Sequence, residues 1–314
     1  MRIEEIIERI EKRYCKEVTL VTHLPKPHHS DDVTATALLQ ILFEDIFGGY
    51  GVKTRLVQTF KPREEGYNDE TPDTVVYDIG MGIYDHHQPE GRHPLYDNIL
   101  RPEGGKYSST GLIWKSIGKY LVPEVYVEDL YKDLFSYIDD ADNGVTTNPL
   151  STMIRYMNMY NPDDHDESFR ASVGIMKIFI KASMNQYKDK YSEYDEVKKI
   201  IDECNGVVAV ADKYYKTLSE EAGKAVIPFV VFPDARSETG GYTFRTVTYP
   251  NMGMQDYIIP IPQEVRNWEG VNFLHPSGFL GTAVSKERAV EICELVAKNA
   301  GFEVHNVSDV EFDN

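Results

Sequence analysis

The sequence has few cysteines and no long hydrophobic run. Its 314 residues include only Cys15, Cys204 and Cys293. Because these are far apart and odd in number, we expect neither a disulfide framework nor a zinc knuckle, and we expect each to fill a gap in the core. No apolar run reaches the roughly 18–20 residues that a membrane helix needs. The N-terminal residues also lack the apolar core of a signal peptide, so we expect a cytoplasmic protein without a membrane contact.

Basic residues are also few. The chain has 33 Lys and Arg against 51 Asp and Glu, a formal net charge of −18. Stable binding to duplex DNA by bulk charge is therefore not expected, because counterion release requires a basic surface. An enzyme that binds a single phosphate through metal ions remains compatible with this charge. Most of the acidic excess is expected to serve solubility, and the rest to gather around metal ions.

Strand and helix patterns alternate in the first part of the chain. We predict strands at 18–22, 52–59 and 73–79 and helices at 3–14 and 31–46, the second ended by Gly48 and Gly49. This alternation favours βαβ units and a parallel sheet. Residues 108–186 are mostly helical in pattern, and the polar stretch 186–202 reads as an exposed helix or a linker.

The chain is long enough for two domains. We place them at residues 1–190 and 205–314, on either side of the polar stretch. The second is predicted to be a smaller α/β unit, with strands at 225–232, 242–249 and 271–274 and a closing helix around 289–296.

Three histidines and two aspartates lie close together between the first predicted strand and the following helix. They are His23, His28, His29, Asp31 and Asp32. In open α/β sheets, ligands bind beyond the carboxyl ends of the strands. Ser30 or Asp31 could instead cap the helix, but a cap needs one oxygen and no histidine.

A second cluster begins at Asp78, which ends an apolar predicted strand. A carboxylate in such a place must be paired or bound to a metal, because burying it alone is costly. Asp85, His86 and His87 follow shortly afterwards. A solvated turn is the alternative, but the apolar residues just before Asp85 weigh against it.

A third candidate is Asp142. At helical spacing it shares one face with Phe135 and Ile138, so it is predicted to face the core at a helix end. The alternative is an aspartate in a frayed helix end. Asp139 and Asp140 are expected to be solvated.

Histidine and carboxylate ligands without cysteine suit Mn²⁺, Co²⁺, Zn²⁺ or Mg²⁺. If one carboxylate bridges two such ions, the site can activate water and stabilise the leaving oxygen of an in-line displacement. The three clusters together therefore point to phosphoester hydrolysis.

The ordered set of motifs resembles the DHH phosphoesterase superfamily, in the branch of metal-dependent protein hydrolases that includes the melanocyte-proliferating-gene exonucleases. The resemblance is carried by Thr22, His23, His29, Asp31 and Asp32, and by the segments 85–88, 108–112, 138–144, 241–245 and 275–281. Two places differ from the family pattern, namely Pro276, where alanine is usual, and the loop 79–82.

The resemblance implies an α/β fold with an N-terminal parallel-sheet DHH-type domain and a smaller C-terminal α/β substrate-binding domain. It implies two divalent ions, Mn²⁺ first, with Mg²⁺, Co²⁺ or Zn²⁺ as alternatives. One ion would be held by His23, His29 and Asp78, and the other by Asp31, Asp78, His86 and Asp142, with a hydroxide between the ions as the nucleophile. His87 would donate a hydrogen bond to the phosphoryl oxygen, while Asp32 and Asp85 would orient the histidines.

The second domain is expected to bind the substrate. Backbone N–H groups at Ser277 and Gly278 could approach a phosphate closely, and His275, Arg245 and Arg266 could clamp it. Both arginines could equally be solvated surface residues. A base could stack on one of the many aromatic side chains, but the sequence does not single one out.

The resemblance selects the substrate, and we expect a 3′–5′ exonuclease acting on RNA or short oligonucleotides. One alternative is a small-molecule phosphohydrolase acting on pyrophosphate, polyphosphate or cyclic dinucleotides. Another is a non-catalytic homologue that binds metal or nucleotide. A zinc protease is not favoured, because the sequence has no His-Glu-x-x-His motif.

Overall fold

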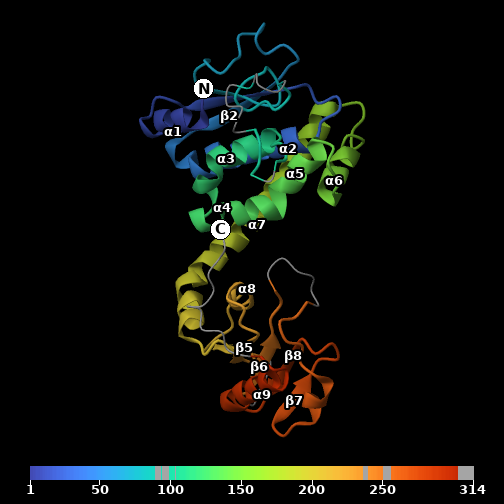
Figure 1. Ribbon diagram of the computed structural model, residues 1–314. Coiled ribbons are helices and arrows are strands. Elements are labelled where there is room, and N and C mark those ends of the chain that lie inside the picture. Colours follow the sequence, from blue (N-terminus) through green and yellow to red (C-terminus); the bar gives the residue numbers. More distant parts are fainter. Residues whose placement is uncertain (89–92, 94–98, 103, 236–239, 250–255, 303–314) are drawn as a thin grey trace. The chain divides into compact units, whose positions relative to one another are not determined.

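The computed structural model describes residues 1–314 except 89–92, 94–98, 103, 236–239, 250–255 and 303–314 (Figure 1). The chain divides into two compact units, Met1–Lys188 (unit 1) and Asp189–Asn314 (unit 2). The division falls within the 39-residue helix α7, His165–Glu203. The polar stretch 186–202 is therefore the last part of a long helix.

A parallel three-stranded sheet lies at the centre of unit 1. Its order is β2-β1-β3, with β1 at Glu17–Thr22, β2 at Lys53–Gln58 and β3 at Thr74–Val76. Residues 18–22 of β1 are all buried, as expected for a strand with neighbours on both sides and helices on its faces. All three strands end at the same edge, so the segments that follow them begin close together. The predicted parallel sheet is thus confirmed, although β3 is shorter than expected.

Helices of unit 1 cover this sheet and position the clusters. Helix α1 (Ile3–Glu11) buries its four isoleucines and ends earlier than predicted, where Arg13 takes a left-handed conformation (φ 62°). Helix α2 (Ser30–Gln40) is buried on all sides except at Gln40, which marks it as the central helix. It continues as a π-helical segment, Ile41–Ile46, and a 3₁₀ turn, Gly48–Tyr50.

Further helices follow α2 in unit 1. They are α3 (Ser109–Leu121), α4 (Val127–Leu130), α5 (Ser136–Asp142) and α6 (Pro149–Met157), with a 3₁₀ turn at Glu124–Tyr126 and a π-helical segment at Tyr131–Phe135. Of these helices, α3, α5 and α6 contact α2. Helices α2, α3 and α5 contact one another, and they lie side by side in Figure 1. No helix in the described part of the chain is both long and apolar enough to span a membrane.

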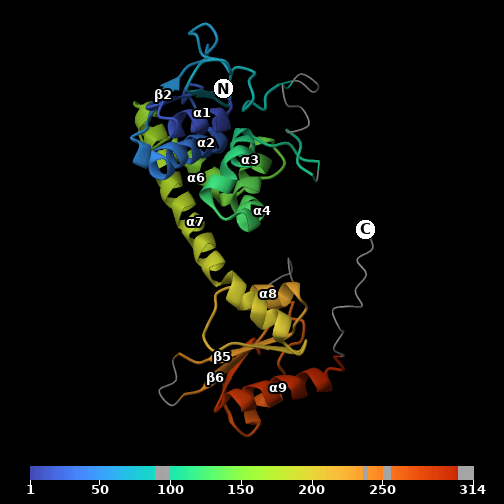
Figure 2. The same ribbon diagram turned by 90° about the vertical axis from the view of Figure 1, so that its left-hand side faces the viewer.

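A mixed five-stranded sheet forms unit 2. Its order is β4-β5-β6-β8-β7, and only β4 and β5 are parallel. The strands are β4 (Val208–Val210), β5 (Phe229–Pro233), β6 (Tyr242–Thr246), β7 (Val271–Leu274) and β8 (Leu280–Ala283). Helix α9 (Lys286–Asn299) covers one face, while α8 (Leu218–Lys224) and the end of α7 cover the other (Figures 1 and 2). A 3₁₀ turn, Gln263–Asn267, precedes β7.

Two strands of unit 2 are missing from the sequence prediction, for identifiable reasons. Strand β4 has only three residues, too few for a periodic signal. Strand β8 contains Gly281, which is unfavourable in a strand unless a neighbour needs the space. Here the ring of Phe244 occupies that space, because a Cβ at position 281 would clash with Phe244 Cζ and lie 2.8 Å from the carbonyl oxygen of Phe273.

We expect Gly281→Ala to lower the free energy of unfolding by about 2 kcal/mol, because Phe244 is buried and the carbonyl of Phe273 belongs to the paired strand. Thermal denaturation should show the loss, and Phe244→Leu in the same chain should restore part of it. Gly174→Ala, in α7 with open space around its Cα, is the control and should be neutral or slightly stabilising. A melting temperature of Gly281→Ala equal to that of the wild type would contradict this packing.

Candidate metal centre

The loop between β1 and α2 presents its polar groups in an ordered way. Asp32 Oδ1 accepts hydrogen bonds from the backbone N–H groups of His29 (2.9 Å) and Val33 (2.7 Å), so Asp32 caps α2, rather than Ser30 or Asp31. Asp31 is fully buried, and neither of its carboxylate oxygens accepts a hydrogen bond from any described residue. Such a carboxylate is costly unless a cation or proton compensates it.

His23 faces two carboxylates. Its Nδ1 lies 2.7 Å from the carbonyl oxygen of Leu24, which can only accept, so Nδ1 carries a proton and the neutral ring keeps its lone pair on Nε2. That Nε2 lies 3.1 Å from both Asp32 Oδ2 and Asp78 Oδ2. Three acceptor atoms therefore point at one another, and either a proton or a cation must lie among them.

Asp78 is held in a strained conformation just beyond β3. Its φ is +56°, a left-handed value that is uncommon for residues other than glycine. Its N–H donates to the carbonyl oxygen of Tyr84 (3.1 Å), and Ser109 Oγ donates to its Oδ1 (3.2 Å). These contacts fix a buried carboxylate at the edge of the sheet, between the loop of His23 and the segment of His86.

The segment Asp85-His86-His87 divides its side chains between the inside and the surface. His86 is buried, and its Nε2 lies 3.0 Å from Asp142 Oδ2, 3.5 Å from Asp78 Oδ1 and 3.8 Å from Asp31 Oδ2. Neither His86 Nε2 nor Asp142 Oδ2 has hydrogen-bond geometry with any described residue. They too are buried candidate ligand atoms without a hydrogen-bond partner among the described residues.

His87 is the exposed member of this segment, with 58% of its side chain accessible. Asp85 Oδ1 accepts hydrogen bonds from its N–H (3.0 Å) and its Nδ1 (2.8 Å), which leaves Nε2 directed elsewhere. The hydrogen bond to Asp85 raises the pKa of His87. Asp85 itself is held by the N–H of Met81, which donates to its Oδ2 (2.7 Å).

Asp139 is not solvated, contrary to the prediction. It is fully buried, and it accepts hydrogen bonds from Ser108 N–H (3.0 Å), Ser108 Oγ (2.7 Å), Gly111 N–H (3.1 Å) and Tyr131 Oη (2.6 Å). It thereby caps the first turn of α3 from α5. Gly111 is required there, because a Cβ would clash with the Asp139 carboxylate. Asp140 is half-buried and pairs with Arg101 at 2.5 Å, so it too departs from the prediction.

The ligand atoms fall into three groups, each with its atoms within 4.8 Å of one another. They are His23, Asp32 and Asp78; His29, Asp31 and Asp142; and Asp78, His86 and His87. Asp78 belongs to two of them. The resemblance implied that His29 would share an ion with His23 and Asp78. In the structure Asp32 lies beside His23 and Asp78 instead, and His29 lies beside Asp31 and Asp142.

Charge and burial act together on these groups. Burial raises the pKa of Asp31, and the neighbouring carboxylates of Asp78 and Asp142 raise it further. Burial lowers the pKa of His23, but the facing carboxylates of Asp32 and Asp78 outweigh this and raise the pKa to about 11. Burial alone would raise the pKa of Asp78, but the neighbouring imidazoles of His23 and His86 lower it. Nitrogen and oxygen donors in this arrangement fit divalent ions such as Mn²⁺, Mg²⁺, Co²⁺ or Zn²⁺.

His28 stays outside the groups and supports the loop. It is buried, its Nε2 lies 2.9 Å from Ser172 Oγ, and burial lowers its pKa to about 4. Asn158, at the end of α6, accepts from the His28 N–H and donates to its carbonyl oxygen, both at 2.9 Å. No sequence signal connects Asn158 or Ser172 to the loop, because the contacts span more than a hundred residues.

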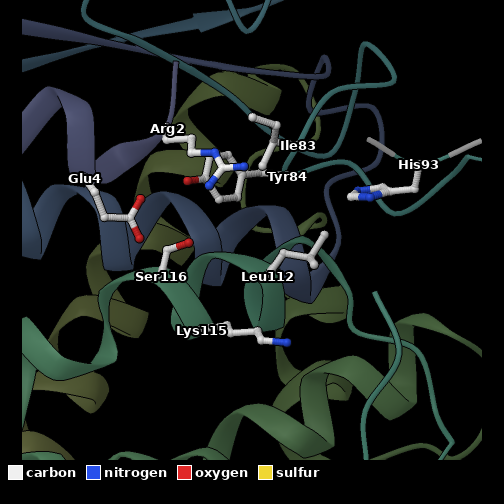
Figure 3. Close-up of a pocket in the computed structure, with 8 residues that line it drawn as sticks. All are labelled: Arg2, Glu4, Ile83, Tyr84, His93, Leu112, Lys115 and Ser116. Atoms are coloured by element: carbon white, nitrogen blue, oxygen red, sulfur yellow. The ribbon is translucent and has the colours of Figure 1, made fainter. Parts of the chain in front are cut away.

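A small cavity of about 190 Å³ is lined by Ile83 and Tyr84, which directly precede the segment Asp85-His86-His87. In Figure 3, Arg2, Ile83 and Tyr84 lie on one side, and Leu112, Lys115 and Ser116 of α3 on the opposite side, with Glu4 and His93 at its two ends. The hydroxyl of Tyr84 accepts a hydrogen bond from the N–H of Ile3 (3.0 Å), which ties α1 to this segment. None of the candidate ligands lines this cavity.

Unit 2 brings together the residues predicted to bind substrate. His275, Ser277 and Gly278 form the turn between β7 and β8, and Arg245 lies on β6, opposite Leu280 of β8. Arg266 Nη2 donates to the carbonyl oxygen of Leu274 (3.3 Å) and to Gln263 Oε1 (3.2 Å).

Comparison with known proteins identifies the family. Residues 19–296 match the family model MYG1_exonuc, described as an uncharacterised protein family (UPF0160). The chain belongs to this family. A MYG1 protein of Saccharomyces cerevisiae is 24% identical over 328 residues, covering 85% of this chain and 92% of its own length. A MYG1 protein of Dictyostelium discoideum is 23% identical over 339 residues, covering 87% and 94%.

Solved structures give weaker likenesses to the MYG1_exonuc chain. The manganese-bound exonuclease RecJ is 14% identical with a TM-score of 0.29, covering 99% of this chain and 97% of its own. The pGpG-specific phosphodiesterase PggH from Vibrio is 12% identical with a TM-score of 0.29, covering 91% and 99%. Scores this low do not establish a shared overall arrangement, so the assignment rests on the family model. The predicted resemblance to the melanocyte-proliferating-gene exonuclease family is confirmed.

We expect Asp31→Asn to have opposite effects with and without metal. In EDTA it should raise the melting temperature or leave it unchanged, because it removes a buried, unpartnered charge. Added Mn²⁺ should stabilise the wild type by mass action and should shift the variant much less. Thermal melts with and without Mn²⁺ measure both, with the exposed Asp212→Asn as control. Equal Mn²⁺ shifts in wild type and variant would exclude Asp31 as a ligand.

Asp139 should show its role in the pH dependence of stability. Burial raises its pKa to about 6, against about 4 in an unfolded chain. The folded state therefore binds this proton more tightly, and this carboxyl makes folding less favourable as pH rises from about 4 to about 6. The melting temperature of Asp139→Asn minus that of the wild type should therefore increase as pH rises from about 4 to about 6.

Asp139→Ala is the companion variant, and at pH about 4 it should lower the free energy of unfolding by about 3 kcal/mol, a difference from the wild type that shrinks as pH rises towards about 6. It leaves the buried N–H groups of Ser108 and Gly111 without an acceptor. A difference between Asp139→Asn and wild type that does not change with pH would argue that Asp139 is not a titrating buried acid.

Proposed function

We propose that this chain is a two-metal-ion phosphodiesterase, a 3′–5′ exonuclease that acts on RNA or short oligonucleotides. The observation that carries the proposal is the set of buried ligand atoms without hydrogen-bond partners among the described residues: both oxygens of Asp31, Asp32 Oδ2, His86 Nε2 and Asp142 Oδ2. Atoms of this kind, gathered from three segments, are the donors that divalent ions prefer. The substrate and the polarity follow from the resemblance of the motifs to the family of exonucleases.

His23, Asp32 and Asp78 would hold one ion, with His29, Asp31, His86 and Asp142 around the other and Asp78 between them. When bound, the two ions would supply an acidified water and neutralise charge that builds on the phosphoryl group. Asp32 performs two tasks, since its other oxygen caps α2 and holds His29 in place.

His87 would act directly on the substrate. Asp85 fixes its ring through Nδ1 and favours the charged form, so Nε2–H is available to a phosphoryl oxygen or to the leaving oxygen. Its exposure suits this role, because the group must reach a substrate that comes from solvent. The turn at His275–Gly278 and Arg245 in unit 2 would bind a phosphate of the substrate.

The acidic surface favours short substrates. With a net charge of −18, the chain gains little from long polyanions through counterion release. The same observation supports the second candidate, a phosphohydrolase for pyrophosphate, polyphosphate or cyclic dinucleotides. Duplex DNA remains an unfavourable partner under either proposal.

An assay of purified protein with Mn²⁺ tests these candidates. The substrates are a 5′-labelled short RNA, its DNA equivalent, inorganic pyrophosphate and a cyclic dinucleotide. We expect a ladder of products shortened from the 3′ end of the RNA. Phosphate release from pyrophosphate alone would favour the small-molecule enzyme. Bound Mn²⁺ without turnover of any substrate would indicate a non-catalytic homologue.

In the same assay His86→Ala should reduce the rate by at least about 100-fold, since it removes a buried ligand atom at the shared edge of the groups. Circular dichroism should show the fold retained. His165→Ala, at the start of α7 and outside the three groups, is the matched control and should keep the wild-type rate. Near-wild-type activity of His86→Ala would remove His86 from the ligand set.

A further inference from the structure

The turn between β7 and β8 is tightly built. His275 N–H donates to the carbonyl oxygen of Leu280 (2.9 Å), and Gly278 N–H donates to the carbonyl oxygen of His275 (2.8 Å). Gly278 has a φ of +73°, and a Cβ there would lie 2.5 Å from the carbonyl oxygen of Ile261. The turn therefore holds one shape against the segment that precedes β7.

The shape of the turn fixes which nitrogen of His275 carries a proton. Ser277 N–H lies 3.1 Å from His275 Nδ1, and Ser277 Oγ lies 2.8 Å from the same atom. A backbone N–H only donates, so Nδ1 accepts and the proton of the neutral ring lies on Nε2. No described residue accepts from that Nε2–H, so it is a donor available to a ligand.

Arg245 supplies a cation beside this donor. It is half-buried on β6, and no described residue forms an ion pair or hydrogen bond with its guanidinium. Arg266, by contrast, already donates to Leu274 and Gln263. Of the two arginines predicted to clamp a phosphate, Arg245 is the one with free donors.

Two phenylalanines flank the histidine. The ring of Phe279 lies 4.6 Å from that of His275, and the Arg245 guanidinium lies 5.9 Å from the Phe279 ring. On β7, the ring of Phe273 lies 6.5 Å from His275 and is 47% exposed. An exposed flat ring thus stands next to donors that suit a phosphate. A nucleotide combines the same two groups, a phosphate and an aromatic base.

We propose that Phe273 stacks against a nucleobase of the substrate whose phosphate is bound by the His275 turn and Arg245. This deepens the proposed function and rests on it. Phe273 then selects nucleotide substrates over pyrophosphate and polyphosphate, which contain no base. Stacking on an aromatic side chain tolerates any base, so it suits an enzyme that degrades a strand one residue after another.

Binding without turnover tests the stacking. The full chain in EDTA is titrated with a 5′-phosphorylated dinucleotide that contains 2-aminopurine, whose fluorescence is quenched when the base stacks. We expect the fluorescence to be quenched on binding to the wild type. In Phe273→Ala the quenching should be lost and the dissociation constant should be about 10-fold larger. Phe273→Trp should restore both, which a purely structural role of Phe273 would not predict.

Phe179→Ala is the matched control, because Phe179 is also a phenylalanine of similar exposure, 46%, but lies on α7 in unit 1. It should bind like the wild type. Competition by inorganic pyrophosphate should be equally strong in wild type and in Phe273→Ala, since that ligand meets only the turn and Arg245. The proposal would be overturned if the wild type did not bind the dinucleotide, or if Phe273→Ala bound it as tightly as the wild type does.

The two proposals fail separately. Phe273-dependent binding in a protein that hydrolyses no phosphodiester would refute the catalytic function and leave the stacking site standing. Hydrolysis of RNA together with binding that ignores Phe273 would refute the stacking site alone.

Discussion

Acceptor atoms that face one another, and that need a proton or a cation among them, are the constraint on which unit 1 depends. His23 Nε2, Asp32 Oδ2 and Asp78 Oδ2 meet at about hydrogen-bond distance. Buried like charges repel strongly where the dielectric is low, and the cluster could relieve that repulsion only by moving apart. It cannot move apart, because Asp78 is locked in a left-handed conformation and Asp32 caps α2. The fold therefore holds a place among these atoms for positive charge, either a proton on His23 or a bound cation.

Residues outside the three candidate ligand groups maintain this arrangement. Asp139 joins α5, which ends at Asp142, to the first turn of α3, where Ser109 contacts Asp78. Gly111 allows the two helices to approach closely enough for that contact. The segments 108–112 and 138–144, which read as separate motifs in the sequence, are thus one structural joint. Asn158 plays a similar part for the loop of His29, through the backbone of His28.

The sequence predicted those features that a local pattern can carry. The parallel sheet followed from alternating periods, and the inward direction of Asp142 followed from its spacing to Phe135 and Ile138. Asp139 was misjudged because an acid on a helix looks solvated until the partner helix is known, and the N–H groups that donate to it belong to Ser108 and Gly111, about thirty residues earlier. Strand β8 was missed because the reason for Gly281 is the ring of Phe244, on a neighbouring strand. The base-stacking candidate could not be chosen among 36 aromatic residues until exposure and neighbours were known.

Under the proposed function, the two units would meet the demands of phosphate chemistry by different physical means. Unit 1 concentrates negative charge, so on its own it repels a phosphodiester and depends on cations for any attraction. Among its described residues, unit 2 offers the unpaired Arg245, the imidazole N–H of His275 and the backbone of a rigid turn, which are few but directional contacts. An acidic chain cannot rely on diffuse attraction to a polyanion, so recognition must come from such contacts and from stacking. A short strand with a free end satisfies these requirements, whereas a long duplex would gain only repulsion from the rest of the surface.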